Sequence, residues 1–290
     1  MLPFVEQPAW RVVPLTIHAF GLAVAAALAL GTARARRRHL QLGLDPHVGE
    51  RLGWWTLAGG ALGAHLFSVL LYFPERLRGD PWLLLRLWED VRAFGGMLGG
   101  LAGAALFLAR RVGPAARRDA LAYLDVIAWV FPASLAVGRV GCALAHDHPG
   151  VVTDAPLAIA LRSDAAFAHM AGVYAAAGRA LPPDARALGF HDLGLYEMLW
   201  LALVVVPAFA WWGRRSAPRR PAGFFLAAFA ALYLPVRFWL DTLRVADARY
   251  AGLTPAQWVA AVGLAALPFL AVPRRRRALR HAVGAAAILG

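Results

Sequence analysis

The sequence contains no lysine, so the 30 basic residues behind its formal net charge of +13 are all arginines. Alanine is abundant, and this bias points to GC-rich coding more than to a particular partner. Basic and aromatic residues do not interleave as they do in nucleic-acid-binding modules, so no nucleic acid is expected among the partners. The single cysteine, Cys142, excludes an intrachain disulfide framework.

Charged residues are also scarce, at 16% of the 290 residues, whereas hydrophobic residues make up 60%. A typical soluble domain is about 45–50% apolar and about 25% charged. The composition therefore predicts an integral membrane protein. The N-terminal residues lack a basic segment and a cleavage site before the first apolar run, so no removable signal peptide is expected.

Apolar runs close to the roughly 20 residues needed to cross a bilayer recur along the chain. They predict seven transmembrane helices near residues 14–32, 52–73, 94–109, 120–137, 193–212, 222–240 and 255–272. The expected fold is an all-α polytopic membrane protein, with one membrane domain over residues 1–290.

Arginine clusters indicate how the chain is oriented. They follow the first, third, fifth and seventh spans, near residues 34–38, 110–118, 214–220 and 274–277. Because basic residues gather in cytoplasmic loops, the N-terminus is expected outside and the C-terminus in the cytoplasm. Between spans four and five, residues 143–190 are then an extracytoplasmic loop region with short helices at most, and residues 74–93 are an outer amphipathic segment.

Polar chemistry concentrates between Val137 and Gly150, where the fourth span is expected to end. Gly138 and Gly141 allow close backbone approach, and Arg139 offers a planar fork of donors suited to phosphate. At the edge of a membrane this combination indicates a lipid headgroup, and a helix end with a snorkelling arginine is the alternative. The same stretch continues with His146, Asp147 and His148.

Charges also end the sixth span. Arg237, Asp241 and Arg244 share one helical face, and Asp241 is placed to supply the partner that a buried Arg237 requires. For Arg244 an interfacial role is an equal alternative. At the same outer end the fifth span opens with further polar residues, and we expect these to line one cavity with both arginines: His191, Asp192, Tyr196 and Glu197.

Other readings of single residues are less favoured. The histidines and aspartates have none of the spacings of closed zinc sites, so no metal is expected. Cys142 is interpreted as a buried packing residue rather than a nucleophile. Asp125 and His65, inside spans, are expected to be satisfied by neighbouring backbone groups.

Glycines recur in the second span, from Gly59 to Gly63, and in the third, from Gly95 to Gly103. Small residues at such spacing let transmembrane helices pack closely. The alternative is that the second run lets a lipid approach the backbone at Gly99 and Gly100.

In their order along the chain, these features resemble the bacterial phosphatidylglycerol:prolipoprotein diacylglyceryl transferase family. The resemblance rests on IHAFGL, GALGAHLFSVLLY, LWEDVRAFGGMLGGLAG, GRVGCALAHDHPG, FHDLGLYE and RFWLDTLRVADARYAGLTPAQW. The residues that match positions of the family's motifs are these: Gly138, Arg139, Gly141, Asp147, Gly150, His191, Leu195, Tyr196, Glu197, Arg237, Asp241, Arg244, Asp247 and Gln257.

The resemblance implies an enzyme of lipoprotein maturation in the bacterial cytoplasmic (inner) membrane. It transfers a diacylglyceryl group from phosphatidylglycerol to the lipobox cysteine near the signal peptide of a prolipoprotein, and it uses no cofactor. Arg139 and Arg237 would hold the phosphate, with Asp147 and Asp241 orienting them. The implied lipid-contacting residues are Gly99, Gly100, Gly138, Gly141, Gly150, Tyr196, Glu197 and Arg244.

Three polar positions of the family are Phe20, Leu98 and Cys142 here, in place of tyrosine, histidine and asparagine. Another group must then accept the thiol proton, and imidazole titrates near the working pH. The candidates are His146, His148, His191 and His18. The alternative is a non-catalytic or differently specific paralogue that binds anionic lipid or docks lipoproteins; a transporter is less favoured because no internal repeat is evident.

Overall fold

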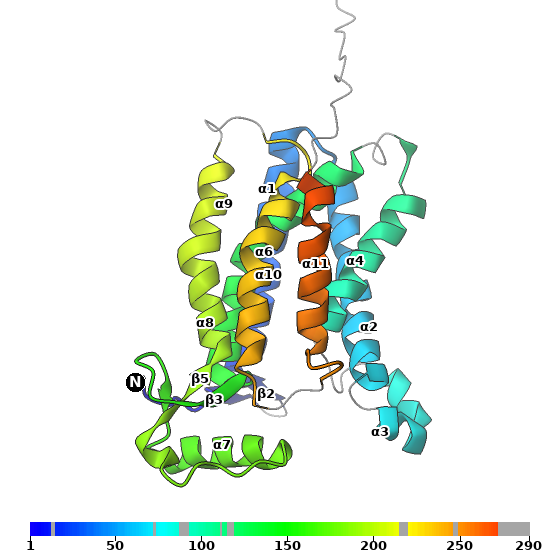
Figure 1. The fold of residues 1–290 in the computed structure, drawn as a ribbon. Helices are drawn as coiled ribbons and strands as arrows, with labels where there is room; N and C mark the ends of the chain where they lie inside the picture. The colour runs from blue at the N-terminus through cyan, green and yellow to red at the C-terminus, as the bar shows by residue number, and fades with distance from the viewer. Residues whose placement is uncertain are drawn as a thin grey trace, which may run out of the picture.

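The computed structural model describes residues 1–12, 15–71, 74–86, 93–110, 112–114, 119–214, 220–245 and 249–271. Helices run side by side as a bundle, and a small head of strands and one helix lies at one end (Figure 1). Five helical units are long and apolar enough to cross a membrane: α1 (Ala19–Leu42), α2 (Pro46–Leu71), α6 (Ala120–Ala145), Leu193–Trp212 and α10 (Phe224–Thr242).

Two shorter apolar helices complete the bundle, α4 (Ala93–Arg110) and α11 (Pro255–Ala271). The unit Leu193–Trp212 consists of α8 (Leu193–Trp200), the π-helical turn η3 (Leu201–Val205) and α9 (Val206–Trp212). These helices occupy the seven predicted spans, so the helical polytopic membrane fold is confirmed.

Several predicted span bounds differ from the structure; α1 continues to Leu42 and α2 already begins at Pro46. The first predicted span begins with a strand, β2 (Leu15–His18), which pairs with β1 (Ala9–Val12). The fourth span does not end at residue 137, because α6 continues to Ala145 and stops where His146 takes a left-handed backbone (φ 48°). The last turns of α6 pack on α1, and this packing offsets the weak helix preference of glycine.

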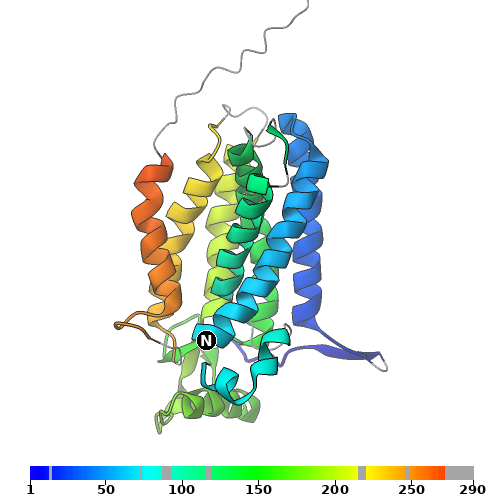
Figure 2. The ribbon, with the colours of Figure 1, turned by 90° about the vertical axis from the view of Figure 1, so that its right-hand side faces the viewer.

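The arginine-rich helix ends lie together, away from the head. The last turns of α1, which carry Arg34 to Arg38, and the ends of α4 and α9 point to the opposite end of the bundle (Figures 1 and 2). Predicted cluster residues 111, 115–118, 215–219 and 272–290 lie outside the described residues. The arrangement supports the expected orientation, which stays a prediction.

Residues 143–190, expected as a loop region, fold into the head. Its sheet has the order β3-β5-β4, all antiparallel, from β3 (Pro149–Thr153), β5 (Gly189–Asp192) and β4 (Ile159–Ala160). Helix α7 (Asp164–Ala176) is capped by Ser163, whose hydroxyl accepts from the Ala166 N–H, and η2 (Ala185–Ala187) follows. Buried side chains including Met170 and Phe190 form its core. The strands were missed because each is too short to show alternation.

The segment 74–86 adds two short helices at the head end of the bundle, α3 (Pro74–Gly79) and η1 (Pro81–Leu85). The remainder of the predicted amphipathic segment, residues 87–92, lies outside the described residues. The placement of this segment on the outer face stays a prediction.

The glycines of α2 and α4 bring the two backbones into direct contact. A Cβ on Gly99 would lie 2.2 Å from the Gly59 carbonyl oxygen, and one on Gly63 would lie 2.4 Å from that of Gly95. A Cβ on Gly100 would lie 3.2 Å from the Thr56 carbonyl oxygen. The structure thus favours helix packing over lipid contact for Gly99 and Gly100, because each backbone is covered by the other helix.

Helices α6, α8, η3, α9 and α10 share the main apolar core of the bundle. Leu201, Phe209, Phe225 and Phe229 are buried within it, and Phe229 stacks on Tyr233 with ring centroids 4.8 Å apart. This packing fixes the head-proximal ends of α6, α8 and α10 against one another. The predicted polar residues of three separate spans therefore meet.

Candidate active site

Two buried arginines share one carboxylate where these three helices meet. Arg139 of α6 donates from Nε to Glu197 Oε1 of α8 at 2.8 Å, and Arg237 of α10 donates from Nη1 to Glu197 Oε2 at 2.9 Å. Their side chains are at most 6% exposed. Tyr233 donates a further hydrogen bond to Glu197 Oε1 at 2.6 Å. Glu197 thus fixes the distance between the two guanidinium groups.

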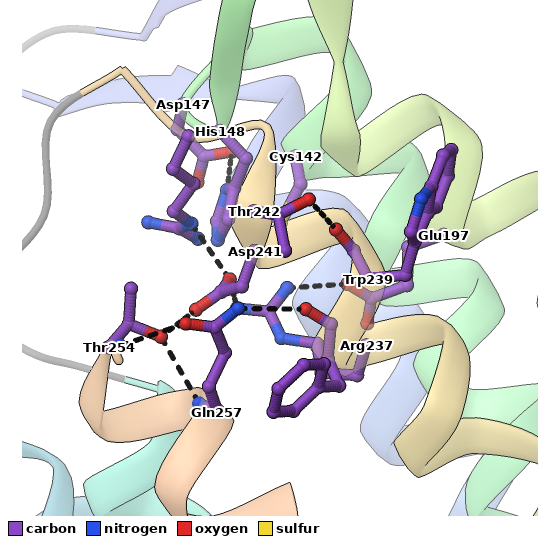
Figure 3. A network of polar contacts seen from close by, with 12 residues as sticks. Cys142, Asp147, His148, Glu197, Arg237, Trp239, Asp241, Thr242, Thr254 and Gln257 are labelled. Atoms are coloured by element: carbon purple, nitrogen blue, oxygen red, sulfur yellow. Dashed lines mark hydrogen bonds and ion pairs between the residues drawn. The ribbon is translucent and has the colours of Figure 1, made fainter. Parts of the chain in front are cut away.

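A second carboxylate extends this network toward the head (Figure 3). Asp241 Oδ1 lies 3.0 Å from Arg237 Nη2 and 3.1 Å from Arg244 Nε, and Asp241 is fully buried. The Thr254 hydroxyl donates to Asp241 Oδ2, and Gln257 bonds the Thr254 backbone N–H at 3.0 Å. The predicted pairing of Asp241 with Arg237 is therefore observed.

Guanidinium donors in this buried network are suited to an anion. Three guanidinium groups, from Arg139, Arg237 and Arg244, face two carboxylates, from Glu197 and Asp241. The Asp147 carboxylate lies near Arg139 and Arg244 and balances the third positive charge, in a region largely shielded from water. Charge-assisted hydrogen bonds to phosphate are stronger in such surroundings than in water.

Asp147 and His148 lie beside Arg139, just after the end of α6. His148 Nδ1 is 2.5 Å from Asp147 Oδ1, and His148 Nε2 is 3.4 Å from Arg139 Nη1. The Cys142 sulfur also lies 3.4 Å from Arg139 Nη1. The expectation that Asp147 orients Arg139 differs from this geometry, because Glu197 holds Arg139 and Asp147 holds His148.

The charges around this pair change how both groups titrate. Burial lowers the pKa of His148 below its ordinary value of 6.5, and the positive charges of Arg139 and Arg244 lower it further, while the bond to Asp147 opposes them. Burial alone would raise the pKa of Asp147, but its bond to His148 and the nearby cations bring it below the usual value. At neutral pH the pair is a neutral imidazole beside a carboxylate.

His146 belongs to the joint between the bundle and the head. Its Nδ1 lies 2.6 Å from Asp192 Oδ2, its Nε2 lies 3.1 Å from the Val5 carbonyl oxygen, and its ring stacks on Phe4. Both ring nitrogens are therefore engaged within the fold. This geometry does not favour His146 as a proton carrier.

His191 and Tyr196 border an open cavity of about 710 Å³ on the flank of the bundle. His191 Nδ1 lies 3.0 Å from the Tyr196 hydroxyl, and burial lowers the pKa of His191. The cavity walls are otherwise apolar and come from α8, η3 and α10, with Trp200 and Trp239 among them, and from residues 155–157 of the head. The expected single cavity is thus two regions, a buried charged network and an apolar groove.

The glycines of the stretch from Gly138 to Gly150 leave room for neighbouring segments. A Cβ on Gly141 would lie 3.0 Å from Phe20 Cα, and one on Gly150 would lie 2.9 Å from His191 Cβ. Gly138 has more space, with Ala27 Cβ at 3.9 Å. Phe20 therefore packs beside Gly141, whereas Leu98 lies on α4 with 41% exposure.

Tyr233 and Thr254 were missed by reasoning from the sequence. Tyr233 precedes Arg237 by four residues and therefore lies on the same helical face, which was a usable signal. The partner of His65 is the Leu83 carbonyl, at 2.9 Å, and Asp125 accepts from the Leu226 N–H, so both are satisfied as expected. Asp247 lies outside the described residues.

The fold and the site define a class: a multi-pass membrane protein with a buried cationic site suited to an anionic group, next to an apolar groove. A family model described as prolipoprotein diacylglyceryl transferase matches residues 7–272. The chain therefore belongs to the prolipoprotein diacylglyceryl transferase family, a family of transferases that act in lipoprotein maturation.

Relatives named phosphatidylglycerol–prolipoprotein diacylglyceryl transferase agree with this assignment. The chain is 31% identical to the protein of Chromohalobacter salexigens over 249 residues, which cover 84% of this chain and 81% of the relative. It is 30% identical to the Bordetella bronchiseptica protein over 265 residues, covering 89% and 90%. It is 30% identical to a Streptomyces coelicolor protein over 301 residues, covering 97% and 77%.

Proposed function

We propose that this protein transfers the diacylglyceryl group of phosphatidylglycerol to the lipobox cysteine of prolipoproteins, in the bacterial cytoplasmic membrane. The observation that carries the proposal is the pair of buried arginines, Arg139 and Arg237, held by one carboxylate at the head end of the bundle. The names of the relatives supply the lipid donor and the protein acceptor.

The arginines suit the chemistry of this transfer. The acceptor thiol must become a thiolate to attack carbon, and the departing glycerol phosphate gains negative charge as its carbon–oxygen bond breaks. Donors that are fixed before the reaction stabilise such charge most effectively. Arg139 and Arg237 are fixed by Glu197, and Arg237 also by Asp241, so little reorganisation is required.

The position of the site suits a lipid substrate. The network lies near the head-proximal ends of apolar helices, where the headgroup of a lipid in the same leaflet would reach it. The apolar groove beside Tyr196 offers space for hydrocarbon chains along α8 and α10. In the expected orientation this end faces outward, where preproteins present their lipobox.

Lipid binding tests the assignment of the arginines. Arg139→Ala and Arg237→Ala should weaken binding of phosphatidylglycerol by roughly ten- to a hundred-fold, and much more than binding of the neutral lipid diacylglycerol, because a charge-assisted hydrogen bond contributes about 1.5–3 kcal/mol. The measurement is titration with each lipid in detergent. Arg186→Ala is the matched control, since Arg186 is 53% exposed in the head and pairs with Asp164. If both site variants bind phosphatidylglycerol like the parent, the phosphate binds elsewhere.

Transfer itself is measured with labelled phosphatidylglycerol and a lipobox peptide. The proposed function expects labelled peptide with the parent protein and a strong loss in both arginine variants. Phe20, Leu98 and Cys142 stand where the family has polar residues, and this difference favours the alternative of a non-catalytic paralogue. That alternative expects no transfer by the parent and a gain when the three residues together become tyrosine, histidine and asparagine.

A further inference from the structure

We infer that the Asp147–His148 pair accepts the proton of the acceptor thiol, the role that Leu98 and Phe20 cannot perform in this chain. The inference rests on the proposed function and adds a named proton acceptor to it. It is carried by the geometry of His148, which joins a carboxylate on one side to the phosphate-binding arginine on the other.

The two contacts of the ring define which nitrogen carries the lone pair, and both nitrogens have a partner. Asp147 is a carboxylate and can only accept, so the nitrogen beside it, Nδ1, carries the hydrogen. Nε2 then has its lone pair, and it faces Arg139 Nη1, which can only donate. The basic nitrogen therefore points toward the group that would hold the substrate phosphate.

The His148 side chain is also partly exposed, at 16%, and that of Asp147 is 37% exposed. His146, with a side chain 6% exposed, has both nitrogens engaged. His169 bonds the His146 carbonyl, and His191 bonds Tyr196 beside the apolar groove. Among the described histidines, only His148 combines partial exposure with contact to Arg139.

The proton and electron balance is complete with this acceptor. The thiol proton passes to His148 Nε2, and the thiolate forms a bond to the glyceryl carbon that carries the phosphate. The carbon–oxygen bond breaks, and its electron pair leaves with glycerol phosphate, next to Arg139 and Arg237. The imidazolium faces the Asp147 carboxylate until it returns its proton to solvent or to the released phosphate.

The charges around His148 predict the pH dependence. Asp147 faces the ring from its own loop, Arg139 and Cys142 from α6, Glu197 from α8, and Arg244 from the residues that follow α10. Because burial and the two arginines lower the pKa of His148 below 6.5, the imidazole is neutral above that pH. Transfer should therefore be constant through neutral pH and fall only on further acidification.

The decisive variant is His148→Gln, tested by single-turnover transfer of labelled diacylglyceryl to a lipobox peptide. Loss of a general base typically lowers a rate by about 10² to 10⁴. The same variant should bind phosphatidylglycerol like the parent, which excludes a collapsed site. His47→Gln is the matched control, since the His47 side chain is 82% exposed on α2 and the residue belongs to the opposite end of the bundle.

The pH profile separates a proton acceptor from a structural residue. Above the ordinary thiol pKa of about 8.5 the peptide thiol ionises without help, so the defect of His148→Gln should shrink as pH rises through this value. A defect of constant size across pH would overturn the inference.

Asp147 is a positioning residue, because its bond raises the pKa of His148. In Asp147→Asn the fall of the transfer rate on acidification should therefore move to lower pH.

The remaining outcomes distinguish this inference from the proposed function. Robust transfer by His148→Gln at neutral pH overturns the inference and leaves the transferase function intact. A parent protein that transfers nothing overturns both. Cys142, Asp147 and His148 present ligand atoms within 4.8 Å of one another, so loss of parental transfer on treatment with a zinc chelator would show a metal role for the cluster and overturn the inference as well.

Discussion

Glu197→Gln is the sharpest test of how the site is held together. The substitution keeps the size of the side chain and removes the negative charge that Arg139 and Arg237 share at 2.8 and 2.9 Å. Because Glu197 is 1% exposed, water cannot replace the lost charge. Removing one partner of a buried ion pair typically costs about 3–5 kcal/mol.

That cost converts into a measurable shift. At roughly 2–4 °C per kcal/mol for a chain of this size class, the thermal midpoint of Glu197→Gln should fall by about 6–20 °C. The assay is thermal unfolding in detergent, followed by intrinsic tryptophan fluorescence. Tyr233→Phe is the matched control, because it removes only the 2.6 Å hydrogen bond to the same carboxylate and leaves both ion pairs. The loss of unfolding free energy in Tyr233→Phe should be smaller, at about 1.5–3 kcal/mol.

Transfer activity gives a second readout of the same variant. Without Glu197 the two arginines repel each other and no longer share a fixed position, so transfer should fall together with the thermal midpoint. A Glu197→Gln protein that melts within one degree of the parent would refute the reasoning. It would mean that the two guanidinium groups relax at no cost, and that Glu197 does not determine their positions.

Two further predictions concern the fold. Reporter fusions should place Arg179 in the head outside the cytoplasm and Gly43, just after α1, inside it; the reverse result at either site contradicts the orientation inferred from the arginine clusters. Gly99→Ala should lower the thermal midpoint by about 2–12 °C, since overpacking costs about 1–3 kcal/mol where its Cβ would lie 2.2 Å from the Gly59 oxygen. Gly53→Ala, on α2 with nothing within 4 Å of its Cβ position, should leave the midpoint unchanged or slightly raised. Equal midpoints for the two variants would refute the packing role of Gly99.

The resemblance to the family was visible in the order of short motifs along the chain. It also identified residues that the structure brings together, above all Arg139, Glu197 and Arg237. It did not show which acid holds which arginine. Asp147 was expected to orient Arg139, and the structure gives that role to Glu197, which lies 58 residues further along the chain.

Hydropathy was enough to locate the seven spans, though not all of their bounds, because each span depends on a local run of residues that must remove its apolar surface from water. The helical spacing of Arg237 and Asp241 likewise determined their pairing, since residues four apart on a helix are neighbours. Only the tertiary structure decided the rest. The strands of the head, the contact of Gly99 with Gly59, and the position of His148 between Asp147 and Arg139 depend on how separate segments pack. No local pattern encodes those distances, because they follow from the relative placement of whole helices.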